Sequence, residues 1–169
     1  LQILLKTTNI GPVRSRLTGQ QRFVLYSVAL GTGLRASELA SLTPANFDLM
    51  ANPPTVRIDA ANEKARRGAV LPLPPDVALV LRKFLCDIPA DMLLWPGRWA
   101  AQKRAGQFLK RDLEAARNEW LSSLPDKHKE SAEQSDFLRY EDSDGRFADF
   151  HALRHTFLSR LGRSGASPK

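Results

Sequence analysis

The sequence predicts a mainly helical α+β domain with a small antiparallel β-sheet of two or three strands on one flank. Apolar residues recur at helical spacing in several segments. Residues 55–59 alternate with β-branched side chains and predict a strand, and residues 69–73 predict its partner across a polar hairpin loop. A length of 169 residues with 43% hydrophobic residues is enough for one core and short for two.

Residues 1–17 are expected to form an extended, linker-like lead-in, because this stretch contains Gly11-Pro12. Residues 18–169 would then form the domain. Thr18 is a candidate N-cap and Gln21 completes a capping box, which predicts a helix from 18 to about 30. Two glycines, Gly31 and Gly33, are expected to end it.

The remaining elements follow in order. A short helix is expected at 36–41 and a possible third strand at 47–48, before the hairpin of 55–59 and 69–73 with its basic loop at 62–68. Helices are then expected at 75–85, at 99–121 and at 147–161. Residues from about 122 to 146 are polar and poor in apolar side chains, which predicts a mobile loop.

Charge is unevenly distributed along the chain. The net charge is +7 and the isoelectric point near 10.0. The segment from Asp126 to Asp144 has seven acidic residues and three lysines or arginines, so it carries −4 and the rest carries +11. An anionic partner is therefore plausible.

Compartment and redox chemistry are constrained by three absences. Cys86 is the single cysteine, so no internal disulfide is possible, and its apolar surroundings predict a small core residue. No apolar run is long enough to span a membrane. No signal peptide is visible, so a cytoplasmic, nucleoid-associated protein is expected. The first residue is Leu1 rather than methionine, which suggests a piece of a longer protein.

The stretch HALRHTF at 151–157 places His151, Arg154 and His155 on one face of a helix. A guanidinium suits a phosphate, and an imidazole can hold or release a proton near neutral pH. One alternative is an ordinary basic surface patch. A zinc site is another, but that motif needs a glutamate where Ala152 stands, and Arg154 would repel a cation.

A second stretch, TGLRASEL at 32–39, looks like a glycine-rich turn that leads into a short helix. Together the two stretches resemble the tyrosine recombinase (phage integrase) family. That family has its first arginine in T-G-L-R-x-S-E-L and its second in H-x-L-R-H-[TS]-F. Both motifs are present in the right order, and the resemblance covers the chain from about Thr18 to the end. It implies an integrase-type catalytic domain.

The resemblance assigns roles residue by residue. Arg35 and Arg154 would hold the phosphate oxygens, His151 would be a general base or oxygen donor, and Lys64 on the hairpin loop would protonate the leaving 5′-oxygen. Glu38 and His155 would support them. Two alternatives stay open: Arg35 could simply pair with Glu38, and Lys64 could be a solvated loop lysine. DNA-backbone contacts are expected from Arg66, Arg67, Lys103, Arg104, Lys110 and Arg111.

The family's nucleophile should be a tyrosine C-terminal to the HALRHTF helix, preceded by a second histidine or tryptophan. Neither appears before Lys169, and Tyr26 and Tyr140 both lie upstream. We therefore expect a catalytic domain trimmed at both ends, which binds DNA poorly or moderately and does not cleave it. The family's N-terminal DNA-gripping domain also has no counterpart.

The implied activity is site-specific recombination of double-stranded DNA through a 3′-phosphotyrosyl intermediate. No metal, ATP or other cofactor is implied, and other protomers of a synaptic tetramer are the expected partners. Two alternatives use the same fold: a type IB topoisomerase-like enzyme, and a DNA-binding module without catalysis. A basic protein that binds RNA or an acidic partner is a weaker alternative, because stacking aromatics are not interleaved with the basic residues.

Overall fold

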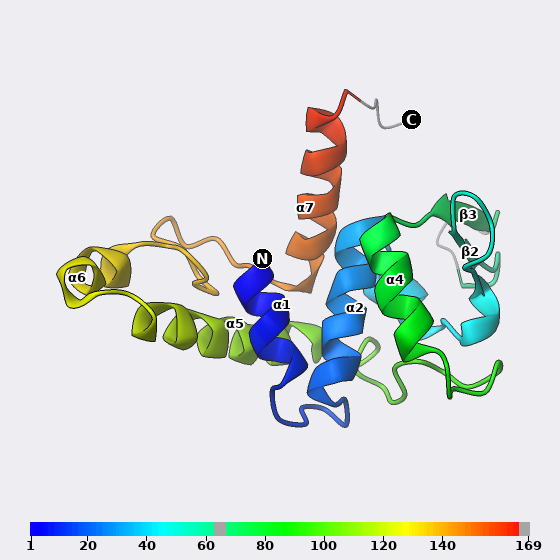
Figure 1. The fold of residues 1–169 in the computed structure, drawn as a ribbon, viewed down its shortest axis with the longest axis horizontal. Helices are drawn as coiled ribbons and strands as arrows, with labels where there is room; N and C mark the ends of the chain where they lie inside the picture. Colours follow the sequence, from blue (N-terminus) through cyan, green and yellow to red (C-terminus); the bar gives the residue numbers. More distant parts are fainter. Residues whose placement is uncertain (63–66, 166–169) are drawn as a thin grey trace.

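The computed structural model describes residues 1–62 and 67–165, and its centre is the helix α2 (Gly19–Thr32). Three helices pack against α2: α1 (Gln2–Asn9), α4 (Pro75–Phe84) and α7 (Phe150–Arg163). Figure 1 shows α7 rising from this body and α5 running away from it. The arrangement is the mainly helical fold that the sequence predicts.

A small sheet lies on the flank beyond α4 (Figure 1). Its strand order is β1-β2-β3 and both pairings are antiparallel. Val56 lies opposite Phe47 on one side and Leu71 on the other, so all three predicted strands are confirmed. The remaining elements are α3 (Ala36–Ala40), a 3₁₀ turn (Pro44–Asn46), β1 (Phe47–Asp48), β2 (Thr55–Ile58), β3 (Ala69–Pro72), α5 (Ala105–Ser122) and α6 (Asp126–Gln134).

The capping box predicted at the start of α2 is present. The Thr18 hydroxyl accepts a hydrogen bond from the Gln21 amide N–H at 3.1 Å, and the Gln21 side-chain oxygen accepts one from the Thr18 N–H at 2.9 Å. Most of the helix is buried on all sides, as expected for a helix at the centre of a bundle. It continues through Gly31 to Thr32, and Gly33 in the left-handed conformation caps it.

A buried carboxylate joins α5 to α2. The Asp112 carboxylate accepts hydrogen bonds from the Arg22 side chain at 2.7 and 3.0 Å, and from the Tyr26 hydroxyl at 2.7 Å. Arg14, in the loop between α1 and α2, adds a further bond of 3.1 Å. Arg22 and Asp112 are almost completely buried, so each charge depends on the other for compensation.

Residues 2–9 form a helix rather than the expected linker-like lead-in. Leu4 and Thr8, one turn apart, are both buried, and α1 packs against α2 and α5. A helix of 8 residues is too short to be stable alone. Its tertiary contacts therefore hold it, and the Gly11-Pro12 signal marks only its end.

Three further expectations are wrong. The acidic segment 122–146 contains the helix α6, and the Arg117 side chain donates hydrogen bonds to the carbonyl oxygens of Ala132, Glu133 and Phe137 on and after it. The long basic helix begins at Ala105 and not at Trp99, because residues 99–104 form turns around the buried Trp99 indole. Cys86 is exposed, since it follows the last turn of α4.

Within residues 1–62 and 67–165, no helix combines the length and apolar character needed to cross a membrane.

We predict that Asp112→Ala destabilises the protein by about 3–5 kcal/mol, because it leaves the buried Arg22 guanidinium without its counter-charge. The measurement is the free energy of unfolding from urea denaturation. The control is Glu114→Ala on the exposed face of α5, which should change that free energy by less than about 0.5 kcal/mol. A loss below about 1 kcal/mol for Asp112→Ala would show that the pair contributes little.

Candidate functional site

The first predicted arginine lies on the turn between α2 and α3. Arg35 is the N-cap residue of α3, and the Glu38 carboxylate accepts hydrogen bonds from its backbone N–H at 2.7 Å and from its Nη1 at 2.9 Å. Glu38 is buried, whereas the Arg35 side chain is 40% exposed. The Arg35–Glu38 ion pair is therefore present, and the rest of the guanidinium remains open to a ligand.

The second predicted arginine lies on α7. Asp149 caps this helix by accepting a hydrogen bond from the Ala152 N–H at 3.2 Å, and Phe150 and Leu153 anchor it in the core. The half-buried Arg154 side chain donates a hydrogen bond from Nη1 to the Gly33 carbonyl oxygen, 121 positions earlier in the chain. The two motifs therefore meet at the turn that carries Arg35.

Gly33 allows this approach. Its φ of +67° is left-handed, and an added Cβ would lie 2.4 Å from Cδ1 of Phe157 on α7. Glycine is the residue that adopts such a φ without strain. The missing side chain at Gly33 lets α7 pack closely against the end of α2. The contact is made by Phe157, which lies one helical turn from Arg154 on α7.

The two histidines of α7 are exposed and lie against each other. Their rings are 4.7 Å apart between centroids and meet edge to face. His151 and His155 therefore share a face of the helix, as predicted. Among the residues that the structure describes, no three histidine, cysteine, aspartate or glutamate side chains gather as metal ligands would.

The structure describes only some of the other predicted site residues. Lys64 and Arg66 lie outside the described residues, and Arg67 is exposed just after them. Lys103 and Arg104 immediately precede the first turn of α5. Further along α5, Arg111 is exposed. The Nζ atom of Lys110 lies 5.4 Å from the centre of the Tyr140 ring.

The two tyrosines have different surroundings. Tyr26 is completely buried, and burial, followed by the neighbouring Asp112 charge, raises its pKa well above the ordinary value. Its phenol stays protonated and donates to Asp112, so it cannot reach a phosphate in solvent. Tyr140 is partly buried between Lys110 and the ring of Phe147.

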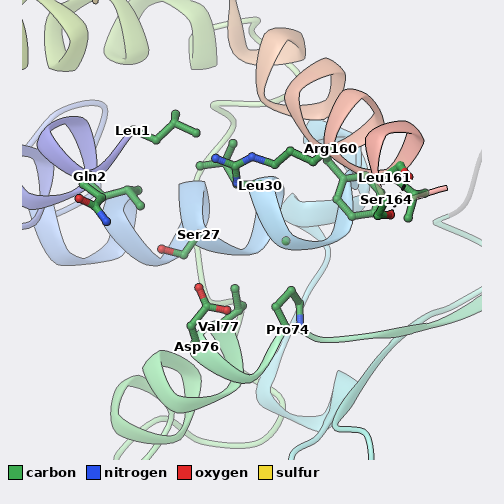
Figure 2. A pocket seen from close by; sticks show the side chains of 13 residues that line it. Leu1, Gln2, Ser27, Leu30, Pro74, Asp76, Val77, Arg160, Leu161 and Ser164 are labelled. Carbon is green, nitrogen blue, oxygen red and sulfur yellow. Dashed lines mark hydrogen bonds between the residues drawn. The ribbon is translucent and has the colours of Figure 1, made fainter. Parts of the chain in front are cut away.

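A cavity of about 540 Å³ lies beside this region but does not contain it (Figure 2). Its walls come from α1, α2, α4 and α7, and they are mostly apolar, with Arg160 and Asp76 among the few charged groups. Arg35, His151 and Arg154 are not among its lining residues. The arginines around the Gly33 turn therefore lie outside this cavity.

Sequence reasoning missed the Arg22–Asp112 pair and the role of Gly33 in the approach of α7. A signal for the pair existed: Arg22 is the single charged residue within 19–32, and Asp112 lies at core spacing with Phe108, Leu109 and Ala116. A charged side chain on a buried face needs a counter-charge, so two opposite charges on two buried helix faces are expected to pair. No local signal could show which glycine α7 would contact.

The sequence profile of the Phage integrase family matches residues 2–169, nearly the whole chain. The protein therefore belongs to the phage integrase, or tyrosine recombinase, family. Among curated proteins, none matches the sequence significantly.

Solved structures show the same fold. The crystal structure of XerA recombinase has a TM-score of 0.63 and 14% identity, over 98% of this chain and 49% of the XerA chain. A Tn1549 transposon integrase in complex with circular intermediate DNA has a TM-score of 0.64 and 18% identity, over 99% of this chain and 53% of the integrase. The chain thus spans about half the length of these structures.

We predict that Gly33→Ala destabilises the protein by about 1–3 kcal/mol, because the new methyl group overlaps Phe157 and the left-handed φ becomes strained. Thermal and urea unfolding measure this loss. The control is Gly162→Ala on the same helix as Phe157, where an added Cβ meets nothing within 4 Å. Equal stability of the two variants would contradict the proposed close contact.

Proposed function

We propose that this chain is the catalytic domain of a site-specific DNA recombinase, which breaks and rejoins DNA. The observation that carries the proposal is the hydrogen bond from Arg154 to the Gly33 carbonyl oxygen. It brings the HALRHTF motif to the turn of the TGLRASEL motif. The XerA recombinase and the DNA-bound Tn1549 integrase have the same fold, which supports double-stranded DNA as the substrate.

In this proposal Arg35 and Arg154 hold the two non-bridging oxygens of the scissile phosphate. Charge grows on these oxygens in the transition state, and a fixed guanidinium stabilises it more than water does. Glu38, buried and bonded twice to Arg35, positions that arginine. His151 acts as general base or oxygen donor, and His155, packed against its ring, orients it.

Lys64 is proposed as the general acid. A loop ammonium can deliver a proton to the leaving 5′-oxygen once DNA covers it. The exposed Arg67, with Arg66, Lys103, Arg104, Lys110 and Arg111, would contact the DNA backbone. The basic surface outside the acidic segment supports this assignment.

The nucleophile is proposed to be a tyrosine of the intact protein C-terminal to Lys169. Its hydroxyl would lose its proton to a base such as His151 and attack phosphorus, which forms a 3′-phosphotyrosyl bond. The bond from phosphorus to the 5′-oxygen would break, and that oxygen would take a proton from Lys64 and leave as the 5′-hydroxyl. A 5′-hydroxyl of a partner strand would reverse the step within a tetramer of protomers. The intact protein would act on DNA in the nucleoid.

A second candidate is a DNA-binding module that keeps the fold without catalysis. The buried, protonated Tyr26 and the packed Tyr140 favour it for this stretch of chain taken alone. A suicide DNA substrate incubated with the intact protein separates the two: a covalent protein–DNA product supports the enzyme, and its absence supports the module.

We predict that Arg154→Ala in the intact protein lowers the rate of covalent-complex formation by about 100- to 1,000-fold, because one oxyanion donor is lost. The rate is measured on a suicide substrate by denaturing gel electrophoresis. The control is Arg163→Ala, an exposed arginine on the same helix, which should react as the unaltered protein does. Retained cleavage by Arg154→Ala would overturn the role assigned to this arginine.

We also predict that a substrate with a 5′-bridging sulfur largely restores cleavage by Lys64→Ala, because a thiolate leaves without a proton. Single-turnover rates on the oxygen and sulfur substrates give the comparison. Arg154→Ala should not be rescued, since its defect lies in the non-bridging oxygens. If Lys64→Ala stays equally slow on both substrates, Lys64 is not the proton donor.

A further inference from the structure

A second basic surface lies at the opposite end of α2 from the Gly33 turn. There, a cavity of about 260 Å³ is lined by three arginine side chains, Arg16, Arg98 and Arg104, together with Ser15 and Gln102, next to the buried Trp99. One wall comes from the loop that precedes α2 and the other from the segment that precedes α5, the two loops at the lower edge of Figure 1.

The two walls come from segments without acidic residues. Residues 1–37 contain five lysines and arginines and no aspartate or glutamate, and the same is true of residues 92–111. Within the described part of the chain, the side chains of Arg16, Arg98 and Arg104 form no hydrogen bond or ion pair. Three exposed arginines therefore border one cavity, and their guanidinium groups have no protein partner among the described residues.

The first wall is a fixed turn. Arg14 and Leu17 exchange backbone hydrogen bonds of 2.9 Å in both directions, and Ser15 and Arg16 between them have φ of +49° and +68°. Positive φ at both central positions is the pattern of a type I′ turn, which usually takes glycine or asparagine. A serine and an arginine kept in this strained position suggest a use for the side chains at the tip.

The buried network of Asp112 holds this turn in place. Arg14, at one end of the turn, donates to Asp112, and the Leu17 carbonyl oxygen at the other end accepts a hydrogen bond of 2.8 Å from Arg22. Arg22 is itself bonded to Asp112 on α5. The same carboxylate thus fixes the turn that carries Arg16 against the helix that Arg104 precedes.

The second wall is equally constrained. The Gln102 N–H donates to the Arg98 carbonyl oxygen at 2.8 Å and the Arg104 N–H to the Trp99 carbonyl oxygen at 2.8 Å. Trp99 is buried, and its indole N–H donates to the Trp95 carbonyl oxygen. Arg98 and Arg104 are therefore carried by a compact turn around a core residue, and little ordering is left for a ligand to impose.

We propose that this cavity binds a phosphodiester group of the DNA backbone, as a second anchor beside the arginine site at Gly33; this rests on the proposed function. Arginine forks match phosphate oxygens, and three of them compensate for the charge of one or two phosphates. The 14 residues of α2 separate the two sites by about 20 Å. That is about six phosphates along one strand of B-DNA.

The test compares two double variants of the intact protein with equal loss of charge. Arg16→Gln with Arg98→Gln removes two cavity guanidinium groups that the proposed function does not already assign to DNA, and Lys83→Gln with Lys127→Gln removes two exposed lysines from α4 and α6. The dissociation constant for a duplex of 25 base pairs is measured between 50 and 300 mM NaCl. The cavity variant should bind about tenfold more weakly at low salt, with a salt slope reduced by about 1 to 2. The lysine variant should keep the original slope.

Each other result is decisive. If the unaltered protein does not bind DNA, both this inference and the proposed function fail. If it binds DNA and the cavity variant matches the lysine variant while melting normally, only this inference is overturned.

A third arm titrates inorganic phosphate alone against the protein, followed by NMR shifts of the Arg98 and Trp99 amides. Phosphate binding there without any change in DNA affinity would assign the cavity to a free anion and overturn the proposal. If Arg16→Gln with Arg98→Gln does not fold, Arg98→Gln alone is measured in the same way, with an expected slope loss of about 1.

Discussion

The approach of α7 to the end of α2 is the constraint on which the arginine site depends. It requires a residue without a side chain at position 33, because a Cβ there would overlap Phe157. It also gives Arg154 a fixed partner, the Gly33 carbonyl oxygen, two positions before Arg35. The guanidinium of Arg154 is thereby held at the turn that carries Arg35, although the two residues come from distant parts of the chain. Such preorganisation is what electrostatic catalysis needs.

The central helix α2 connects this site to the rest of the molecule. One end carries the Gly33 turn, and the other end begins beside the turn that Arg22 and Asp112 hold against α5. A buried ion pair is weak evidence for stability by itself, because desolvation offsets much of its attraction. In this protein the Arg22–Asp112 pair acts on geometry, because it fixes where the loop before α2 and the segment before α5 meet. The surface proposed to face DNA therefore depends on a pair that never touches solvent.

Sequence reasoning worked where the cause of a structure is local. The capping box of Thr18 and Gln21, the alternation of residues 55–58 and the helical spacing of His151, Arg154 and His155 all act within a few residues. It failed where the cause is tertiary. The α1 helix exists because α2 and α5 cover it, and α6 is held by Arg117. The meeting of the two motifs could be expected only from the family resemblance, because no pattern within either motif points to Gly33.

The central claim is that Arg35 and Arg154 bind the same phosphate. A crystal structure of the intact protein bound to duplex DNA tests it most directly. We expect one phosphate with a non-bridging oxygen within hydrogen-bond distance of each guanidinium group, while Glu38 stays bonded to Arg35. A structure in which Arg35 contacts only Glu38 and the phosphate contacts only Arg154, or in which the two arginines face different phosphates, would contradict the account.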